Sequence, residues 1–276
     1  MRIWPGFVCT LFLVTRLGAD ESAPSVDAII TEALERQKLH DEAGNDVRFD
    51  YELVTVSEKL DKTGEVKNTE HELYRSHHID GVVYEKLAEK DGQPLSDKEQ
   101  KREKKREEKF RKKLRKAPSE REDDDEQVRF DRDLLDRYDI ELEETKPLNG
   151  RDTFVLSFHP KSGKLPKKNK FDAVLNNAHG ELLIDRETYE LAGLRFDVDE
   201  KVKLWWGVLG SVSKMSGTLV RAPVDDSVWL PRSFDFYMRG RIFFRSLHLR
   251  QRVAWSKFQE RSTVTTMQSS AQEEHP

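Results

Sequence analysis

Two short motifs have residue types that could form an acyl-transfer site. Ser211 and Lys214 form a Ser-x-x-Lys pair, and Lys62-Thr63-Gly64 forms a Lys-Thr-Gly triplet. Serine enzymes that use both motifs place the serine at the start of a helix and the triplet on a later strand. Here the triplet comes first and falls in a predicted hairpin turn, and the third motif of such enzymes is absent. We therefore expect no acyl-transfer chemistry.

Histidines and acidic residues are the candidate metal ligands. His77 and His78 are adjacent on a predicted strand, so their side chains point to opposite faces and cannot share an ion. The acidic run 123–126 lacks the glycine and the spaced ligands of a calcium loop. No glycine-rich phosphate loop or Gly-x-Ser-x-Gly elbow occurs. The sequence therefore predicts no metal, no cofactor and no enzymatic activity.

The last third of the chain shows the alternation of long amphipathic strands. A period of two predicts a sheet with one apolar and one wet face. Such a sheet must cover its apolar face with protein or with a ligand. The apolar positions of the three runs are Ala192, Leu194, Phe196, Val198, Val202 and Leu204; Phe234, Phe236 and Met238; and Phe243, Leu247, Leu249, Val253 and Trp255.

The N-terminus resembles a secretory signal peptide over residues 1–19, with Arg2 before a short apolar run and small residues before Asp20. Its removal leaves 46 Lys and Arg against 52 Asp and Glu, a net charge of −6, and takes away Cys9, the only cysteine. We expect an exported protein of a Gram-negative-type periplasm. Mild net acidity argues against nucleic-acid binding.

The remaining chain is expected to form one domain over residues 20–261, followed by a flexible tail over 262–276. A helix is predicted over 25–45 with Ser25 as N-cap, followed by a strand over 47–53 and a meander with turns at 61–64 and 79–81. Short helices are predicted over 128–138 and 171–178, and strands fill most of the rest.

Residues 96–126 form a charged helical insertion in this prediction. Ser96 and Glu99 match a capping box, and residues 97–116 hold twelve Lys or Arg against five Asp or Glu, a net charge of +7. A helix this polar cannot be a core element. Two interpretations stay open: a solvated insertion, or a site for an anionic lipid headgroup or an acidic partner.

The patch Trp205-Trp206-Gly207-Val208-Leu209-Gly210 also has two interpretations. It is either a packed bend of the sheet or an apolar mouth element, because an acyl-chain site needs apolar area without directional polar groups.

Three short motifs, in order, resemble the LolA-like superfamily of periplasmic lipoprotein carriers and RseB-type envelope sensors. They are Asn149 to Leu156, Gly180 to Tyr189, and Val228-Trp229-Leu230-Pro231. The resemblance implies an α+β, mainly β fold: a strongly curved, half-open antiparallel β-barrel lidded by helices. The charged insertion is an addition to the carriers' pattern.

The resemblance further implies a lipid- or lipoprotein-binding protein that holds acyl chains in an aromatic cavity. The alternative is an envelope-stress sensor or protein-interaction module whose barrel is packed with side chains. The residues expected to line the cavity are Phe49, Tyr51, Leu53, Phe196, Val198, Trp205, Trp206, Phe234 and Phe236.

Overall fold

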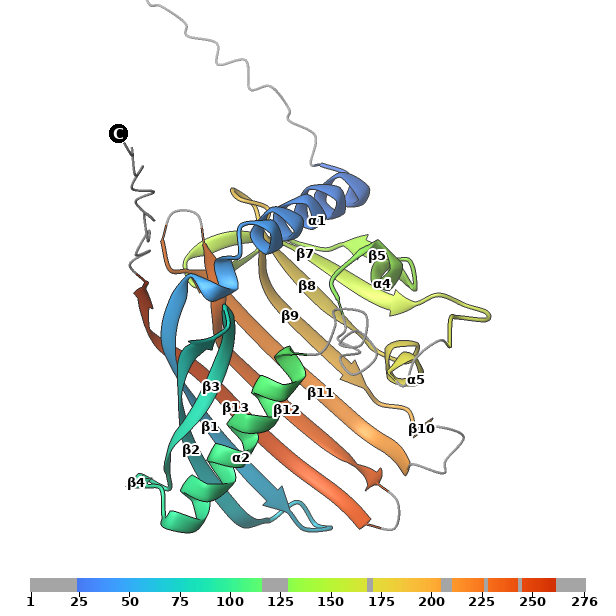
Figure 1. Ribbon diagram of the computed structural model, residues 1–276. Helices are drawn as coiled ribbons and strands as arrows, with labels where there is room; N and C mark the ends of the chain where they lie inside the picture. The colour runs from blue at the N-terminus through green and yellow to red at the C-terminus, as the bar shows by residue number, and fades with distance from the viewer. Residues whose placement is uncertain are drawn as a thin grey trace, which may run out of the picture.

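One antiparallel sheet dominates the fold (Figure 1). The computed structural model describes residues 24–115, 129–167, 171–204, 210–225, 228–242 and 245–261. The sheet has thirteen strands in the order β4-β3-β2-β1-β13-β12-β11-β9-β8-β7-β5, with β10 on β11 and β6 on β7. Its first and last strands do not pair, so the predicted half-open, mainly β architecture is confirmed.

Chain order places the strands in two runs on either side of the charged helix. The first run and its helices are α1 (Val26–Glu42), η1 (Asn45–Val47), β1 (Phe49–Leu60), β2 (Val66–Ile79), β3 (Val82–Lys90), β4 (Gln93–Pro94) and α2 (Asp97–Leu114). The second run is α4 (Arg132–Leu135), β5 (Tyr138–Leu142), β6 (Lys146–Leu148), β7 (Arg151–Pro160), α5 (Asp172–Leu175), β8 (His179–Asp185), β9 (Leu191–Val198), β10 (Val202–Leu204), β11 (Gly210–Pro223), β12 (Trp229–Ile242) and β13 (Arg245–Glu260).

The register gives the sheet two chemically distinct faces, because directly paired residues of antiparallel strands lie on the same face. One face carries an apolar row that crosses eight strands from β5 to β1: Leu142, Leu156, Leu182, Leu194, Leu219, Phe234, Val253 and Thr55. The neighbouring row on the opposite face is mostly polar: Ser157, Glu181, Arg195, Thr218, Asp235 and Arg252. The predicted alternation of wet and apolar faces is therefore confirmed.

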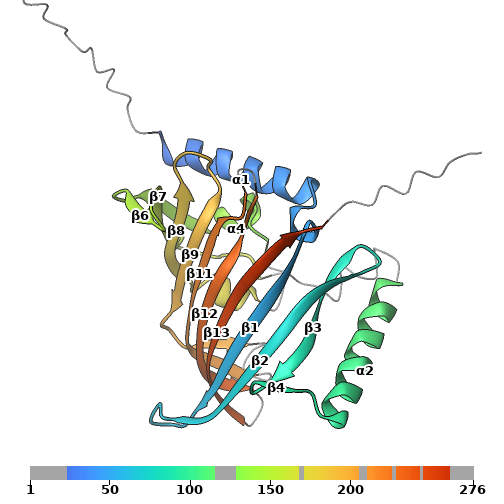
Figure 2. The ribbon, with the colours of Figure 1, turned by 90° about the vertical axis from the view of Figure 1, so that its left-hand side faces the viewer.

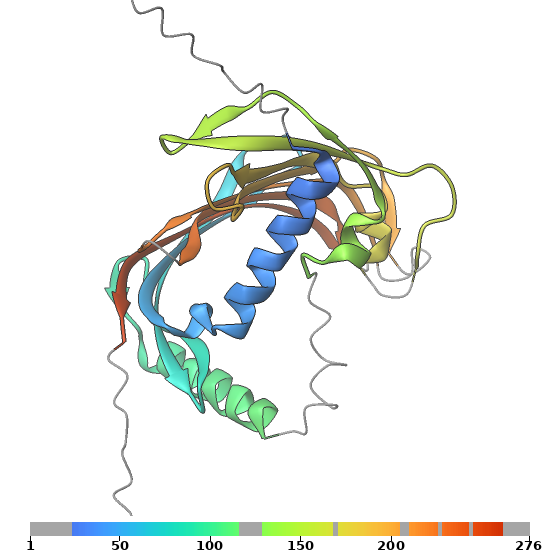
Figure 3. The same ribbon diagram turned by 90° about the horizontal axis from the view of Figure 1, so that it is seen from above.

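Helix α1 crosses the concave side of the sheet (Figure 3). Ser25 caps it by accepting a hydrogen bond from the Ala28 N–H at 3.2 Å, as predicted. The apolar stripe of α1, formed by Ile29, Ile30 and Ala33, is buried in the main core cluster. Its other buried members are Leu135, Tyr138, Phe154, Leu156, Phe158, Leu182 and Ile184. The apolar row thus lies on the concave face, and α1 covers the part of it that belongs to β7 and β8.

Helix α2 lies outside β3, at one edge of the sheet (Figure 2). The predicted capping box is present, with Ser96 accepting from the Glu99 N–H and Glu99 accepting from the Ser96 N–H. Seen from above, α2 continues the curve of the sheet beyond β3 (Figure 3).

The short helices differ from the prediction in extent. The helix predicted over 128–138 is the single turn α4, capped by Asp131, and Tyr138 already begins β5. Tyr138 pairs with Pro160, and its ring meets Phe158 edge-on at 4.9 Å, so sheet pairing ends the helix. The helix predicted over 171–178 is the shorter α5. Among the described residues, no helix is both long and apolar enough to span a membrane.

The three motifs that resemble the LolA-like superfamily meet at one buried cluster. Arg151 donates to both carboxylate oxygens of Asp185, at 2.6 and 2.8 Å, and its guanidinium lies 5.5 Å from the centre of the Trp229 ring. Asp185 also accepts from the backbone and the hydroxyl of Thr188, which closes the β8–β9 hairpin. Burial opposes ionisation of Asp185, but these hydrogen bonds outweigh it and lower its pKa. The motifs are therefore structural.

Candidate functional site

The concave face divides into a covered half and an open half. The covered half comprises the concave side chains of β5, β7, β8 and β9 under α1, and its central Leu156 and Leu182 are buried. The open half comprises the concave side chains of β11, β12, β13 and β1 that continue the same rows. There, Leu219, Phe234 and Val253 are only half-buried, whereas Thr55 and Leu53 at the β1 end are buried. We take the open half as the candidate functional site.

Aromatic rings lie at the centre of the open half and at its border with the covered half, where Phe196 of β9 packs against the core cluster. The Phe234 and Phe236 rings stack with centroids 5.9 Å apart. Gly217 pairs with both Phe236 and Phe196, and a Cβ at Gly217 would lie only 2.4 Å from the Phe196 ring. The glycine therefore lets Phe196 lean over β11, which joins the three rings into one surface. Such a surface offers apolar area and π faces but no directional hydrogen bonds.

The residues predicted to line the cavity differ in burial and in contacts. Phe234 and Phe236 stack on each other, and Phe196 lies across Gly217 from Phe236. Tyr51 is half-buried in a small pocket that Tyr84 and Phe110 also line, and its hydroxyl donates to Glu85 at 2.9 Å. Three others are buried. Phe49 packs against Val228 and Leu230, Val198 packs against Ala178 and Val202, and Leu53 is only 6 % exposed. Trp205 and Trp206 lie outside the described residues, as do 1–19, 116–126, Phe243 and 262–276.

Further apolar residues in the described part of the open half lie outside the predicted lining. Leu219 and Met215 come from β11, and Met238, Val253 and Trp255 come from β12 and β13; all five are half-buried. Alternation around Gly217 could have found Leu219 and Met215, because the positions 215, 217 and 219 share a face. Gly217 interrupts the alternation of apolar residues in β11, so the sequence pattern alone does not indicate an amphipathic strand there.

The floor of the open half becomes polar toward β1 and β2. The Gln251 side chain donates to the Ser57 hydroxyl at 3.3 Å, and the paired residues beyond Ser57 and Thr55 are Glu70 and Glu72. The apolar surface available to an elongated ligand thus ends at β1. Polar ends of such a ligand could meet hydroxyl, amide and carboxylate groups there.

The other candidate chemistry does not assemble. Ser211 and Lys214 lie on β11, not on a helix, and Lys214 pairs with Asp199 at 3.4 Å. His77 meets the Tyr84 ring, while His78 lies 3.4 Å from the Asp50 carboxylate, so the two imidazoles have separate surroundings. Within the described ranges, no three His, Cys, Asp or Glu residues are placed to hold a metal ion.

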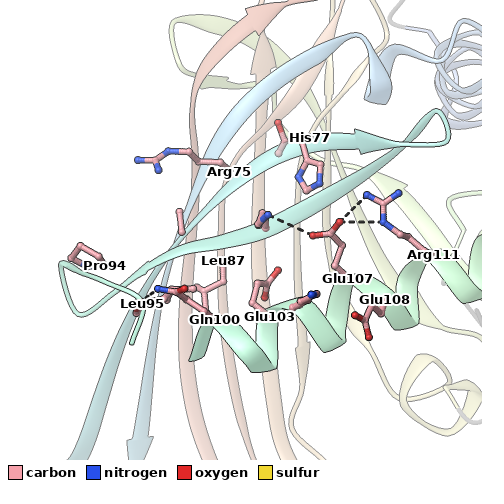
Figure 4. A pocket seen from close by; sticks show the side chains of 14 residues that line it. Arg75, His77, Leu87, Pro94, Leu95, Gln100, Glu103, Glu107, Glu108 and Arg111 are labelled. Carbon is pink, nitrogen blue, oxygen red and sulfur yellow. Dashed lines mark hydrogen bonds and ion pairs between the residues drawn. The ribbon is translucent and has the colours of Figure 1, made fainter. Parts of the chain in front are cut away.

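A second depression lies between α2 and strands β2 and β3 (Figure 4). It is an open groove of about 950 Å³ with an apolar strip formed by Leu87, Ala88, Pro94 and Leu95. Charged groups surround this strip, and Glu107 bridges Lys86 at 3.5 Å and Arg111 at 2.8 Å (Figure 4). The groove thus combines an apolar strip with charged lining residues that pair with one another.

Comparisons with known proteins find structural likeness only. No family model and no curated protein matches the sequence. The chain is similar to a putative outer membrane lipoprotein-sorting protein domain from Vibrio parahaemolyticus, with 11 % identity, a TM-score of 0.34, and 86 % of this chain and 95 % of that chain covered. It is similar to a LolA superfamily protein from Nitrosomonas europaea, with 10 % identity, a TM-score of 0.30, and coverage of 87 % and 95 %.

A DUF1329 family protein from Desulfovibrio piger has 13 % identity and a TM-score of 0.33, with coverage of 87 % of this chain and 95 % of that chain. The likeness concerns the fold, and the candidate site rests on the geometry described above.

Proposed function

We propose that this chain is a periplasmic, non-enzymatic lipid- or lipoprotein-binding protein that holds acyl chains against the open half of its concave face. The observation that supports it is the apolar row that runs from a dry core under α1 into half-exposed side chains on β11, β12 and β13. Acyl chains have the chemistry that such a surface accepts, since burial of apolar area needs no directional partner.

The mixture of side chains also suits a flexible apolar ligand. Met215 and Met238 pair across β11 and β12 beside the phenylalanines. Methionine adapts its shape at little cost, and aromatic rings present flat apolar surface. The surface can therefore follow acyl chains of different length or unsaturation without a fixed contact pattern.

The second candidate function is an interaction module of an envelope-stress sensor. The groove between α2 and β3 favours it, because a partner peptide could lie on the strip from Leu87 to Leu95. In this alternative, the open half would be covered by protein in the assembled complex and would carry no lipid.

The test of the proposal is lipid retention by a variant that makes the open half polar. The protein is purified from its native envelope and analysed by native mass spectrometry, and binding of a fluorescent fatty-acyl probe is measured. Phe236→Asp places a carboxylate in the middle of the apolar surface, so we expect probe binding at least about tenfold weaker. Bound lipid should disappear from the mass spectrum of the variant.

The matched control is Val54→Asp, which adds the same charge on the polar, convex face, where Val54 is 38 % exposed. It should retain lipid and bind the probe like the wild type. A folded Phe236→Asp variant with undiminished lipid would disprove the assignment of this surface. A wild-type protein that carries no lipid and binds no probe would shift the conclusion to the interaction module.

A further inference from the structure

The acidic and basic residues of α2 are segregated around the helix. Glu99, Glu103 and Glu107 are spaced by four residues and lie on the stripe that faces β3, together with Phe110. Glu103 is only 6 % exposed, and it accepts from the Tyr84 hydroxyl at 2.8 Å and from Arg106 at 2.9 Å. Glu107 is held by Lys86 and Arg111, and Glu99 caps the helix.

This segregation leaves the outward face of α2 strongly cationic. Its exposed acidic residues are Asp97 and Glu108. Its lysines and its arginine are exposed and form no ion pair with any other described residue. They are Lys98, Lys101, Arg102, Lys105, Lys109 and Lys112. The apolar residues Phe110 and Leu114 lie on the inward stripe and are half-buried, so the outward face has no apolar side chain to insert into a partner.

We propose that the outward face of α2 docks the protein on the surface of an anionic lipid bilayer. Exposed lysines attract anionic headgroups with about 1 kcal/mol for each lysine close to the membrane surface. The proposal rests on the proposed function and extends it. A carrier of acyl chains must meet a bilayer, and α2 lies at the sheet edge beyond β2 and β3, which continue the sheet from the last strand of the open half, β1 (Figures 2 and 3).

The side-chain types favour a membrane over an acidic protein as the occupant. Protein interfaces rely on aromatic and arginine anchors in fitted pockets and are depleted in lysine. The outward face is convex and is formed almost entirely by flexible, strongly hydrated lysines, which suit a fluid surface of mobile charges. Because the face is wholly polar, the helix should adsorb without inserting, and binding should be strongly salt-dependent.

The test measures sedimentation of the purified protein with vesicles of phosphatidylcholine alone or with about one third phosphatidylglycerol. We expect binding only to the anionic vesicles, and release at high salt. The variant Lys98→Gln/Lys101→Gln/Lys105→Gln/Lys112→Gln should bind these vesicles at least about 100-fold more weakly. Glutamine keeps the helix propensity, and none of the four lysines forms a hydrogen bond or an ion pair with another described residue, so the fold should persist.

The matched control replaces four exposed lysines elsewhere, in Lys164→Gln/Lys167→Gln/Lys201→Gln/Lys203→Gln, and should bind like the wild type. Equal binding to both kinds of vesicle, or full binding by the α2 variant, would overturn the proposal. Tight binding of poly-glutamate without vesicle binding would overturn it too, in favour of an acidic protein partner. The acyl probe separates this result from the proposed function: the α2 variant should still bind the probe, and Phe236→Asp should still bind vesicles.

Discussion

The covered and open halves of the concave face are built from the same rows of residues but differ in burial. Leu156 and Leu219 occupy the same row, with Leu182 and Leu194 between them. Leu156 is completely buried under the core cluster that includes α1, whereas Leu219 is half-buried. The difference lies in what packs on top of the sheet, because both residues are leucines in the same row of one sheet.

This difference separates stability from function. Side chains of the covered half exchange water for protein contacts on folding, so they hold the sheet together. Those of the open half keep part of their contact with water, and a ligand can complete their burial. Substitutions in the covered half should therefore mainly lower the free energy of unfolding. Substitutions in the open half should mainly weaken ligand binding.

The largest expected effect is a contrast between two identical substitutions in one row. Leu156→Ala removes a fully buried side chain and should lower the free energy of unfolding by about 2–5 kcal/mol. Leu219→Ala should lower it by less than about 1.5 kcal/mol, because less apolar area is lost. Urea unfolding measures both. Equal losses would mean that the open half is as tightly packed as the covered half.

A second contrast concerns the ion pair that joins the motifs. Arg151→Ala leaves the buried Asp185 without its charged partner and should lower the free energy of unfolding by about 2–3 kcal/mol. Arg195→Ala, on the convex face, breaks an exposed pair with Asp197 at 3.7 Å and should cost less than about 1 kcal/mol. If both variants unfold at the same urea concentration, the cluster does not stabilise the strand ends of the covered half.

The pH dependence of stability should show the same ion pair. Because the folded-state pKa of Asp185 is lowered, its ionised form stabilises the fold above the unfolded-state pKa of about 3.9. That contribution is lost as the pH falls through the lower folded-state pKa. The urea midpoint should therefore decline below about pH 4, and less steeply in Arg151→Ala. Identical profiles for the two proteins would contradict this role of Arg151.

The smallest effect should be confined to the edge of the sheet beyond the open half, where α2 packs on β3. Tyr84→Phe removes the hydrogen bond to the buried Glu103 and should destabilise the docking of α2 by about 1 kcal/mol. Hydrogen exchange should become faster in α2 and stay unchanged in β7 and β8. Tyr237→Phe, which removes the contact with His248 on the opposite face, is the control and should leave exchange in α2 unaltered. Faster exchange throughout the sheet would show that α2 is part of the main cooperative unit.

Local signals predicted most of the fold. Ser25 and the capping box of Ser96 and Glu99 begin helices where expected. The turn at Asp61 forms because its carboxylate accepts hydrogen bonds from the backbone N–H groups of residues 63, 64 and 65. A hydrogen bond from the Thr63 hydroxyl, together with these backbone hydrogen bonds, lowers the pKa of Asp61 to about 2. Tyr138 was assigned wrongly to a helix, since helical spacing of apolar residues does not reveal a strand partner such as Pro160.

The candidate site was predictable only in part. Alternation correctly placed Phe234 and Phe236 on the apolar face, but it could not separate open from buried positions on that face. Phe49 and Val198 obey the same alternation and are nevertheless buried, because Val228 and Ala178 approach them from elsewhere in the chain. Burial depends on these distant neighbours, which strand periodicity does not encode.

The sequence by itself determined the two-faced strands, the apolar stripe of α1 and the excess of positive charge in α2, because each follows from residue spacing within one element. Only the tertiary structure decided which half of the apolar face α1 covers, and that Glu103 and Glu107 turn toward β3 and leave the lysines outside. Both outcomes depend on contacts between segments far apart in the chain. These contacts require the whole sheet to be assembled and curved.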